Sequence, residues 1–233
     1  MSGTPQVTCH DYGDAAVLVH IAGRGRDERW DVAQRLGRSL LAAGVPGLVE
    51  VVSTFQDVVV TFDPLVTETA AIRATILGLA GRPGRPRTPR RLRVPAVYGG
   101  EHGPDLAAVA DEMSMTPSAL VDLHTSADWV VRFTGSPAGA PFMDGPEVPH
   151  SVARMREPRA RVPAGSVAMS GRQSAIYPAT SPGGWRLVGR TPALLFDLDR
   201  DPPMPYTAGD LIRFFAVDAS AWDDHAHRLE AES

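Results

Sequence analysis

Residues 166–190 read SVAMSGRQSAIYPATSPGGWRLVGR and carry the clearest strand pattern in the chain. Three short runs, SVAMS, SAIYP and WRLVGR, follow one another at intervals of roughly ten residues, and turns rich in glycine or proline separate them. Two further runs, ALLFDL and LIRFFAV, continue this pattern to residue 217. Short strands at this spacing are typical of a β-barrel or a β-sandwich.

The first third of the chain has a different pattern. Residues 15–21 (AAVLVHI) predict a buried strand, and residues 29–43 predict a helix with apolar side chains at helical spacing. Two further strands are predicted over 47–53 and 57–63, and a second helix over 67–80. The order β-α-β-β-α makes up most of a split βαβ, ferredoxin-like unit.

A linker separates these two patterns. Residues 81–91 (GRPGRPRTPRR) alternate arginine with proline and glycine and contain nothing suited to a core. We therefore expect a ferredoxin-like α/β domain at 1–84, a β-barrel domain at 85–220 and a frayed polar tail at 221–233. The fold class is α+β.

The start of the barrel domain contains one strand and two short helices. Residues 92–98 (LRVPAVY) predict an edge strand, because Pro95 has no N–H to donate to a neighbour. Helices are predicted over 103–113 and 116–126, and Thr116 is expected to cap the second one.

The composition indicates a globular protein rich in turns. Of 233 residues, 43% are hydrophobic and 21% are charged, which is ordinary globular usage, while 22 glycines and 21 prolines favour β structure over a helical bundle. The net charge of -4 gives no basic field for nucleic acid. No stretch approaches the roughly 18 apolar residues of a membrane helix, and no signal peptide is recognisable, so we expect a cytoplasmic protein.

Two residue types exclude whole classes of site. All 23 Lys+Arg positions are arginine, so this chain offers no Schiff-base lysine, no biotinyl or lipoyl lysine and no Walker-type phosphate lysine. Cys9 is the only cysteine, which excludes an intrachain disulfide and a multi-cysteine metal site. The closely spaced pair His225 and His227 lies in the predicted tail, and no metal site is predicted.

Residues 181–191 (SPGGWRLVGRT) are the least ordinary loop of the chain. Gly183 and Gly184 permit close approaches that a Cβ would block, and Trp185 adds a large flat surface. We interpret the loop as the edge of a binding site. The alternative is a tight turn whose Trp185 closes one end of the barrel.

Other candidate residues also admit two interpretations. The turn 98–106 (YGGEHGPDL) either presents backbone N–H groups to an anion or simply connects a strand to a helix. His124 is either a buried, hydrogen-bonded side chain or a base. Arginines at 154–161 suit carboxylate or phosphate binding, or form a solvated face. The candidate binding residues are Glu101, Asp105, Gly135, Gly139, Gln173, Tyr177, Ser181, Gly183, Gly184, Trp185, Arg190 and Thr191.

The motifs resemble one known family. The run VPAGSVAMSGRQSAIYPATSPGGWRLVGRTPALLFD, with YGGEHGPDL before it and YTAGDLIRF after it, is similar to allophanate hydrolase subunit 1, the Kip-inhibitor-like proteins and the B component of bacterial ATP-dependent 5-oxoprolinase. It also resembles part of the carboxyltransferase domain of urea carboxylase. GDAAVLVHI and PGLVEVV extend the likeness to the first half of the chain.

The resemblance implies a ferredoxin-like N-terminal domain, a cyclophilin-like β-barrel and a heterodimer with a second cyclophilin-like subunit, known as the C component of 5-oxoprolinase or as allophanate hydrolase subunit 2. It also implies a third subunit, the A component, in the 5-oxoprolinase system. The implied reaction opens the lactam of 5-oxoproline to glutamate and uses ATP, with or without Mg²⁺, held at the complex. Such chemistry needs cationic donors around developing oxyanions. We therefore expect catalytic roles for His124, Arg154 and Arg159.

The chain departs from the family pattern in one loop. Where relatives have glycine, phenylalanine, any residue, proline, glycine and phenylalanine, residues 135–140 read GSPAGA, so the glycines remain while both aromatics and the proline are lost. Phe142 replaces an expected tyrosine, and Ala153 replaces the proline of a Pro-Arg pair. Such changes would reshape a pocket enough to alter its substrate.

Three functions follow from these patterns. The first is a subunit that contributes one wall of a shared amidohydrolase site. The second is a regulatory protein that inhibits a sensor histidine kinase and catalyses nothing. The third, a peptidyl-prolyl isomerase, has only the barrel analogy in its favour.

Overall fold

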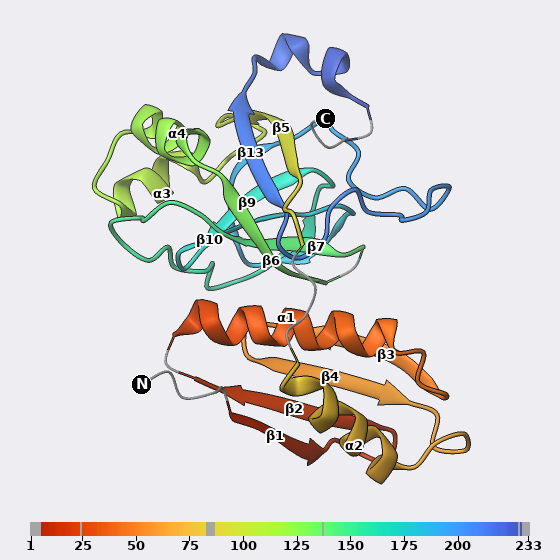
Figure 1. Cartoon of the computed structure of the whole chain (residues 1–233). Helices are drawn as coiled ribbons and strands as arrows, with labels where there is room; N and C mark the ends of the chain where they lie inside the picture. Colours follow the sequence, from red (N-terminus) through yellow and green to blue (C-terminus); the bar gives the residue numbers. More distant parts are fainter. Residues whose placement is uncertain (1–5, 24, 83–86, 137, 228, 230–233) are drawn as a thin grey trace. The chain divides into compact units, whose positions relative to one another are not determined.

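The computed structural model describes residues 6–23, 25–82, 87–136, 138–227 and 229. The chain divides into two compact units, Met1–Arg87 and Thr88–Ser233, each with its own hydrophobic core (Figure 1). The predicted boundary between 84 and 85 falls within 83–86, outside the described residues. No helix in the described ranges is long and apolar enough to cross a bilayer.

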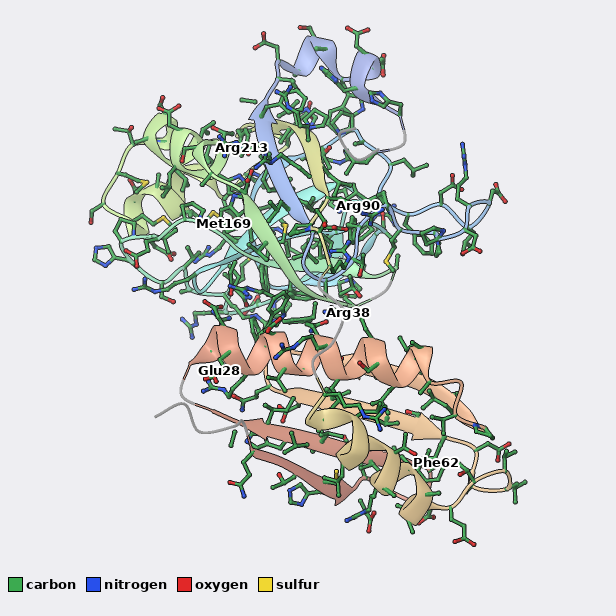
Figure 2. All side chains as sticks on the ribbon, viewed as in Figure 1. Glu28, Arg38, Phe62, Arg90, Met169 and Arg213 are labelled. Carbon is green, nitrogen blue, oxygen red and sulfur yellow. The ribbon has the colours of Figure 1, made fainter. Side chains whose placement is uncertain are left out.

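The first unit is an antiparallel sheet with two helices. Its strands lie in the order β1-β2-β4-β3. Val17, Val19 and Ile21 alternate along one strand and are fully buried, because successive side chains of a strand point to opposite faces. Phe62, labelled in Figure 2, packs in the same core. The elements are β1 (Gln6–Asp11), β2 (Ala16–Ala22), α1 (Arg26–Ala42), β3 (Leu48–Ser53), β4 (Asp57–Phe62) and α2 (Thr69–Ala80).

The predicted order β-α-β-β-α is present, but one strand precedes it. The additional strand β1 reads QVTCHD and pairs with β2 across a short turn that contains Gly13 at φ +72°. Only two of its side chains, Val7 and Cys9, pack against the core, and both are partly buried, so the alternation is too short to predict a strand.

The second unit is built around a barrel. Within the described residues, seven strands close it in the order β10-β7-β6-β13-β5-β12-β9, and β11 and β8 form a separate two-stranded sheet. The elements are β5 (Arg91–Tyr98), α3 (Leu106–Glu112), α4 (Pro117–Ser126), β6 (Trp129–Gly135), β7 (Ala140–Asp144), β8 (Arg159–Val162), β9 (Ser166–Ser170), β10 (Gln173–Ile176), β11 (Ser181–Gly183), β12 (Arg186–Arg190), β13 (Leu211–Ala216) and the 3-10 turns η1 (Ala219–Ala221) and η2 (Asp223–His225).

Strand alternation gives the barrel wall two apolar faces. Val167, Met169 and Val188 point into the main core, where Met169 is visible in Figure 2. Ala168 and Leu187, on the same strands, belong instead to a small cluster with Val162 of β8. The sheet formed by β8 and β11 therefore covers part of the outer wall.

The barrel closes by a parallel pair of strands, β5 and β13, which run side by side from Leu211 opposite Arg91 to Ala216 opposite Ala96. Beside this pair, the fully buried Asp210 accepts hydrogen bonds from the backbone N–H of Arg90 and from its guanidinium, at 2.9 and 2.7 Å. Residues far apart in the sequence are thus joined at this seam.

The prediction that β5 is an edge strand was wrong. β5 pairs with β13 on one side and with β12 on the other. Val217 donates its N–H to Ala96 O, so the even-numbered residues direct their backbone groups toward β13, and Pro95 faces the other side. On that side, the pairing of β5 with β12 includes only Val97 and Tyr98 of β5. No hydrogen bond between the two strands is therefore lost because Pro95 lacks an N–H.

The prediction of a frayed tail after 220 was also wrong in part. Leu229 is buried in the core of the second unit, and its backbone N–H donates to Leu194 O. Leu194 in turn donates to His227 O. The His227 side chain is exposed as expected, whereas His225 is half-buried and meets Phe215 edge to face.

Candidate functional site

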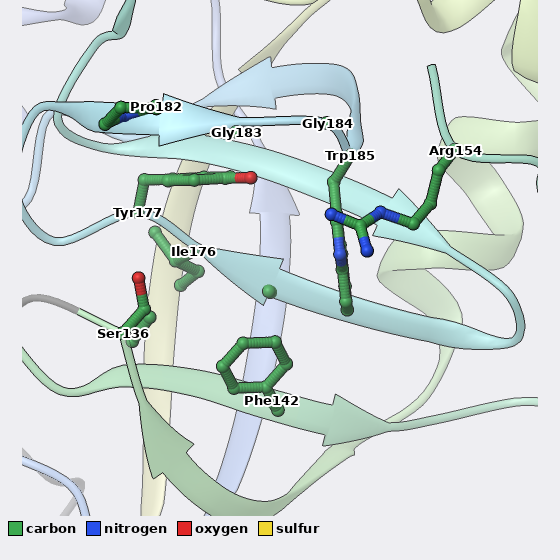
Figure 3. A pocket seen from close by; sticks show the side chains of 11 residues that line it. Ser136, Phe142, Arg154, Ile176, Tyr177, Pro182, Gly183, Gly184 and Trp185 are labelled. Carbon is green, nitrogen blue, oxygen red and sulfur yellow. The ribbon is translucent and has the colours of Figure 1, made fainter. Parts of the chain in front are cut away.

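A pocket of about 160 Å³ lies against the outer wall of the barrel. Phe142 and Trp185 form two of its walls, with ring centroids 5.3 Å apart and planes at 79° (Figure 3). Phe133 stacks on the other side of Phe142 at 4.9 Å and 13°, which fixes the orientation of that ring. The two rings therefore form a corner rather than a parallel slot.

Strand alternation explains why these side chains share one face. Ala140 and Phe142 are two residues apart on β7, and Ala175 lies opposite Phe142 on β10. Met143, which follows Phe142 and points the other way, is fully buried in the barrel core. Tyr177 continues the outward face just beyond β10.

The paired glycines at the end of β11 let the backbone approach the pocket closely. A Cβ at Gly183 would lie 2.3 Å from the Tyr177 hydroxyl oxygen, so only glycine allows the phenol to pack beneath this strand. A Cβ at Gly184 would meet Arg154 Nη2 at 3.5 Å. This close packing agrees with the role expected for the glycines, and Figure 3 shows the Tyr177 ring beneath the strand that carries Gly183.

Arg154 gives the pocket a positive charge. Among the described residues that line it, none is acidic, and the Arg154 guanidinium forms no ion pair with another described residue. Burial raises the pKa of the Tyr177 hydroxyl, while a backbone hydrogen bond with Trp185 and the charges of Arg154 and Arg159 act in the opposite direction. Tyr177 therefore stays protonated at neutral pH and can donate a hydrogen bond.

A polar cluster continues the pocket face along β7. Arg132 Nε donates to Asp144 Oδ2 at 2.9 Å, and Gln173 Nε2 donates to Asp144 Oδ1 at 3.0 Å. Asp144 and Phe142 lie on the same face of the strand, two residues apart. Gln173, a predicted binding residue, thus lies beside the pocket rather than in its lining.

Asp105 and Arg159 form a structural pair outside the pocket lining. Asp105 Oδ2 accepts from the backbone N–H of Leu187 at 2.7 Å, and Oδ1 accepts from Arg159 Nη2 at 2.9 Å. Arg159 also contacts Met155 Sδ. These bonds join the start of α3 to β12 and β8, so the pair fixes the elements that carry the pocket instead of lining it.

His124 lies inside the barrel, which corrects its predicted role as an acid or base. It is 1% exposed and packs against Trp129 and Phe214, with ring centroids 4.8 and 4.5 Å away. Its Nε2 bonds Ser174, whose side chain points inward while the adjacent Ala175 faces the pocket. The wall of the barrel thus separates His124 from the pocket.

Hydrogen bonding and burial keep the His124 ring neutral. Ser174 Oγ donates to Ala168 O, so it accepts from His124 Nε2–H at 3.0 Å, and Tyr98 O–H donates to Nδ1 at 2.7 Å. Burial raises the pKa of Tyr98, so this hydroxyl keeps its proton. Burial also lowers the pKa of His124 to about 3.

We therefore expect His124 to make the protein acid-sensitive. The unfolded chain takes up a proton on this residue near pH 6.5, whereas the folded chain does so only near pH 3. The free energy of unfolding should thus fall as the pH drops below about 6.5, by about 1.4 kcal/mol per pH unit from this group. Urea denaturation between about pH 7 and about pH 5 measures the slope.

The matched variants for this measurement are His124→Gln and His150→Gln. Glutamine at 124 can still donate to Ser174 and accept from Tyr98 but does not titrate, so the difference in slope between wild type and this variant reports His124 alone. The exposed His150 serves as the control. Equal slopes for wild type and His124→Gln would contradict a buried neutral histidine.

The remaining predicted residues lie outside the pocket lining. The Arg190 guanidinium covers Trp222 at 5.1 Å and donates to Ala164 O, and Thr191 Oγ1 accepts from Ala193 N. The Glu101 side chain is 90% exposed and lies near His102.

The other predicted positions near the pocket have backbone roles. Ser181 pairs with Val162 in the outer sheet. Gly135 pairs with Ala140 and packs under the Phe142 ring, while Gly139, at φ +65°, lies against Met204.

Several pocket residues were not among the predicted binding residues. Ser136 and Ala140 line the pocket, and both lie in the loop that departs from the family pattern. The difference from the family pattern at 135–140 was the sequence feature that could have pointed to Ser136 and Ala140. The replacement of the expected tyrosine could likewise have pointed to Phe142. Ala175 and Ile176 gave no signal, because an apolar strand residue reads as core whichever way it faces. Position 137 lies outside the described residues.

The chain belongs to the family described as the carboxyltransferase domain, subdomain C and D, whose model matches residues 7–206. Within it, the chain is similar to the B component of 5-oxoprolinase from Escherichia coli O157:H7, with 34% identity over 212 residues, 88% of this chain and 94% of that protein. The protein of the same name from Bacillus subtilis (strain 168) is 39% identical over 142 residues, 61% of this chain. That alignment spans 58% of the Bacillus protein, less than two thirds of its length.

Solved structures share the fold. The protein TTHA0988 superposes with a TM-score of 0.76 at 30% identity, covering 88% of this chain and 40% of that one. The Kluyveromyces lactis urea amidolyase superposes with a TM-score of 0.76 over 98% of this chain and 16% of the amidolyase. At 19% identity, this second likeness shows the fold alone. Within the described ranges, no group of three or more His, Cys, Asp or Glu side chains could hold a metal ion.

Proposed function

We propose that this chain is a subunit of an ATP-dependent amidohydrolase complex, a 5-oxoprolinase that opens the lactam of 5-oxoproline to give glutamate. The observation that carries this proposal is the alignment with the B component of the Escherichia coli 5-oxoprolinase, which covers 94% of that protein. The fold adds nothing about the substrate, because one fold supports many reactions.

In this proposal the pocket on the barrel wall forms one side of an active site shared with a partner subunit. Arg154, Tyr177 and Trp185 contact the substrate, and Gly183 and Gly184 bring backbone close to it. Asp105 and Arg159 position these elements through the bonds described above. The partner subunit completes the site and supplies the group that transfers protons.

The partner in this proposal is a second cyclophilin-like subunit, and a third subunit completes the complex in the cytoplasm. The antiparallel sheet and two helices of the first unit support a ferredoxin-like assignment, and the closed barrel of the second supports a cyclophilin-like one. The complex, rather than this chain alone, holds ATP, with or without Mg²⁺. The sequence has no Walker-type phosphate lysine, which is compatible with this placement of ATP.

The chemistry proposed for this chain is electrostatic. The amide carbonyl oxygen would take the γ-phosphoryl group of ATP, with ADP as the leaving group. Water would then add to the carbonyl carbon, the C–N bond of the lactam would break, and hydrolysis of the resulting acyl phosphate would give glutamate and phosphate. Negative charge lies on the phosphoryl oxygens throughout, and donors fixed in advance around them lower the barrier. The protonated Tyr177 hydroxyl is a donor of this kind, and the corner of aromatic rings keeps the substrate oriented.

The test is release of glutamate from 5-oxoproline by this chain coexpressed with its genomic neighbours, with ATP present. We expect turnover that is lost when this chain, either neighbour or ATP is omitted. Turnover that persists without this chain would contradict the proposal. A folded complex that is inactive on 5-oxoproline would contradict it too, and would favour another amide substrate or the inhibition of a histidine kinase.

A further inference from the structure

The pocket combines an apolar corner with a cation that has no ion-pair partner among the described residues. Arg154 is an exposed residue, and its Nη2 lies beside Gly184. Its charge acts on the Tyr177 hydroxyl, so the guanidinium stands at the solvent-facing rim of the pocket. Figure 3 shows this guanidinium next to the Trp185 indole, with Phe142 across the pocket. No described acidic side chain lines the pocket to neutralise it.

The Arg154 guanidinium and the aromatic corner of Phe142 and Trp185 suit different groups of a ligand. A guanidinium presents parallel N–H donors whose geometry matches a carboxylate. The corner formed by Phe142 and Trp185 offers one ring face and one ring edge. The small side chains of Ala140 on β7 and Ala175 on β10 also line the pocket. Such a surface suits a compact apolar ring.

The volume limits the size of that ligand. At about 160 Å³, the pocket is smaller than the roughly 300–1,000 Å³ that drug-sized ligands occupy. Gly183 and the Tyr177 ring beneath it close one side. A single small ring with one anionic group fits these limits.

We propose that Arg154 is the carboxylate anchor of this site and determines its specificity: it binds the carboxylate of a small cyclic acid whose ring lies in the corner of Phe142 and Trp185. The Ser136 and Tyr177 hydroxyls then face the polar substituent of the ring. This inference rests on the proposed function for the identity of the reaction. It replaces the catalytic role expected for Arg154 with a binding role.

Binding tests the inference without turnover. Isothermal titration measures binding to the full chain, alone and in its complex without ATP. The probes are 5-oxoproline, cyclopentanecarboxylate, which lacks the lactam, 2-pyrrolidone, which lacks the carboxylate, and acetate, which lacks the ring. We expect both cyclic acids to bind at least about tenfold more tightly than 2-pyrrolidone and acetate, since each lost contact group costs about one factor of ten or more.

Two arginine variants give a matched comparison. Arg154→Met should weaken the binding of both cyclic acids at least about tenfold and leave the affinity for 2-pyrrolidone unchanged. Arg172→Met removes an exposed arginine from the turn between β9 and β10, outside the pocket lining, and should change neither affinity. Circular dichroism confirms that both variants are folded.

The outcomes separate this inference from the proposed function. Equal affinity for 2-pyrrolidone and 5-oxoproline, or cyclic-acid binding that Arg154→Met leaves unchanged, would overturn the inference. The complex could also turn over 5-oxoproline while neither the chain alone nor the complex without ATP shows binding that depends on Arg154. That result would overturn the inference but leave the proposed function standing. Arg154-dependent binding without turnover would support the anchor and contradict the proposed reaction.

Discussion

Replacing Trp185 by alanine is expected to lower turnover of the assembled complex at least about 100-fold, while the chain still folds and pairs with its partner. The indole forms one wall of the corner with Phe142 and packs on the small outer cluster of Val162, Ala168 and Leu187. The main barrel core does not include it. Steady-state kinetics and size-exclusion chromatography of the complex measure the two effects separately.

Trp222→Ala provides the matched control for this variant. Trp222 is also a half-buried indole, and it stacks on His102 at 4.9 Å, outside the pocket lining. Its loss should leave turnover within about twofold of wild type, as expected of residues away from the chemistry. A Trp185→Ala chain that fails to fold or to pair would show that Trp185 is a structural plug.

Replacing Asp105 by alanine is expected to lower the free energy of unfolding by about 3–5 kcal/mol, because it removes one partner of a largely buried ion pair. The carboxylate is 10% exposed and the Arg159 guanidinium 25% exposed. The substitution also leaves the buried N–H of Leu187 without its acceptor. Urea denaturation of the full chain measures the loss.

Two further variants interpret the result. Asp105→Asn keeps an oxygen for the Leu187 N–H but removes the charge facing Arg159, so it should lose less stability than alanine. Asp111→Ala changes an exposed carboxylate of α3 and should alter stability by less than about 0.5 kcal/mol. If Asp105→Ala were as stable as wild type but inactive in the complex, Asp105 would be a binding residue, as the sequence first suggested.

The fold could be predicted from the sequence wherever apolar periodicity was strong. The alternation in 15–21 and the runs SVAMS, SAIYP and WRLVGR predicted their strands correctly. β11 lies in a segment that was interpreted as a loop, and the apolar run 193–198 (ALLFDL), predicted as a strand, forms none. β1 could not be predicted, because this edge strand is stabilised largely by backbone pairing with β2 and only Val7 and Cys9 face the core, which is too short an apolar pattern. Leu229 escaped prediction for a related reason, since one apolar residue in a polar segment reveals no burial.

The site could be predicted only where residues are unusual for their position. Gly183, Gly184 and Trp185 were predicted because no ordinary turn needs all three, and the structure places them in the pocket lining. Asp105, Arg159 and His124 were instead expected in the site because their side chains ionise, although here burial and hydrogen bonds make them structural. The sequence alone cannot distinguish an ionisable side chain that faces a ligand from one that is structural. The difference depends on hydrogen bonds and ion pairs with residues that are distant in the sequence.

The parallel seam between β5 and β13 has a consequence for synthesis on the ribosome. Arg90 and Asp210 meet there although they are 120 positions apart, and contacts of such sequence separation form slowly because a long loop must close first. The first unit holds its own core within the first 87 residues and can fold as it emerges. β5, by contrast, cannot form its parallel pair until β13 has been translated, so during that interval its apolar side chains lack this neighbouring strand.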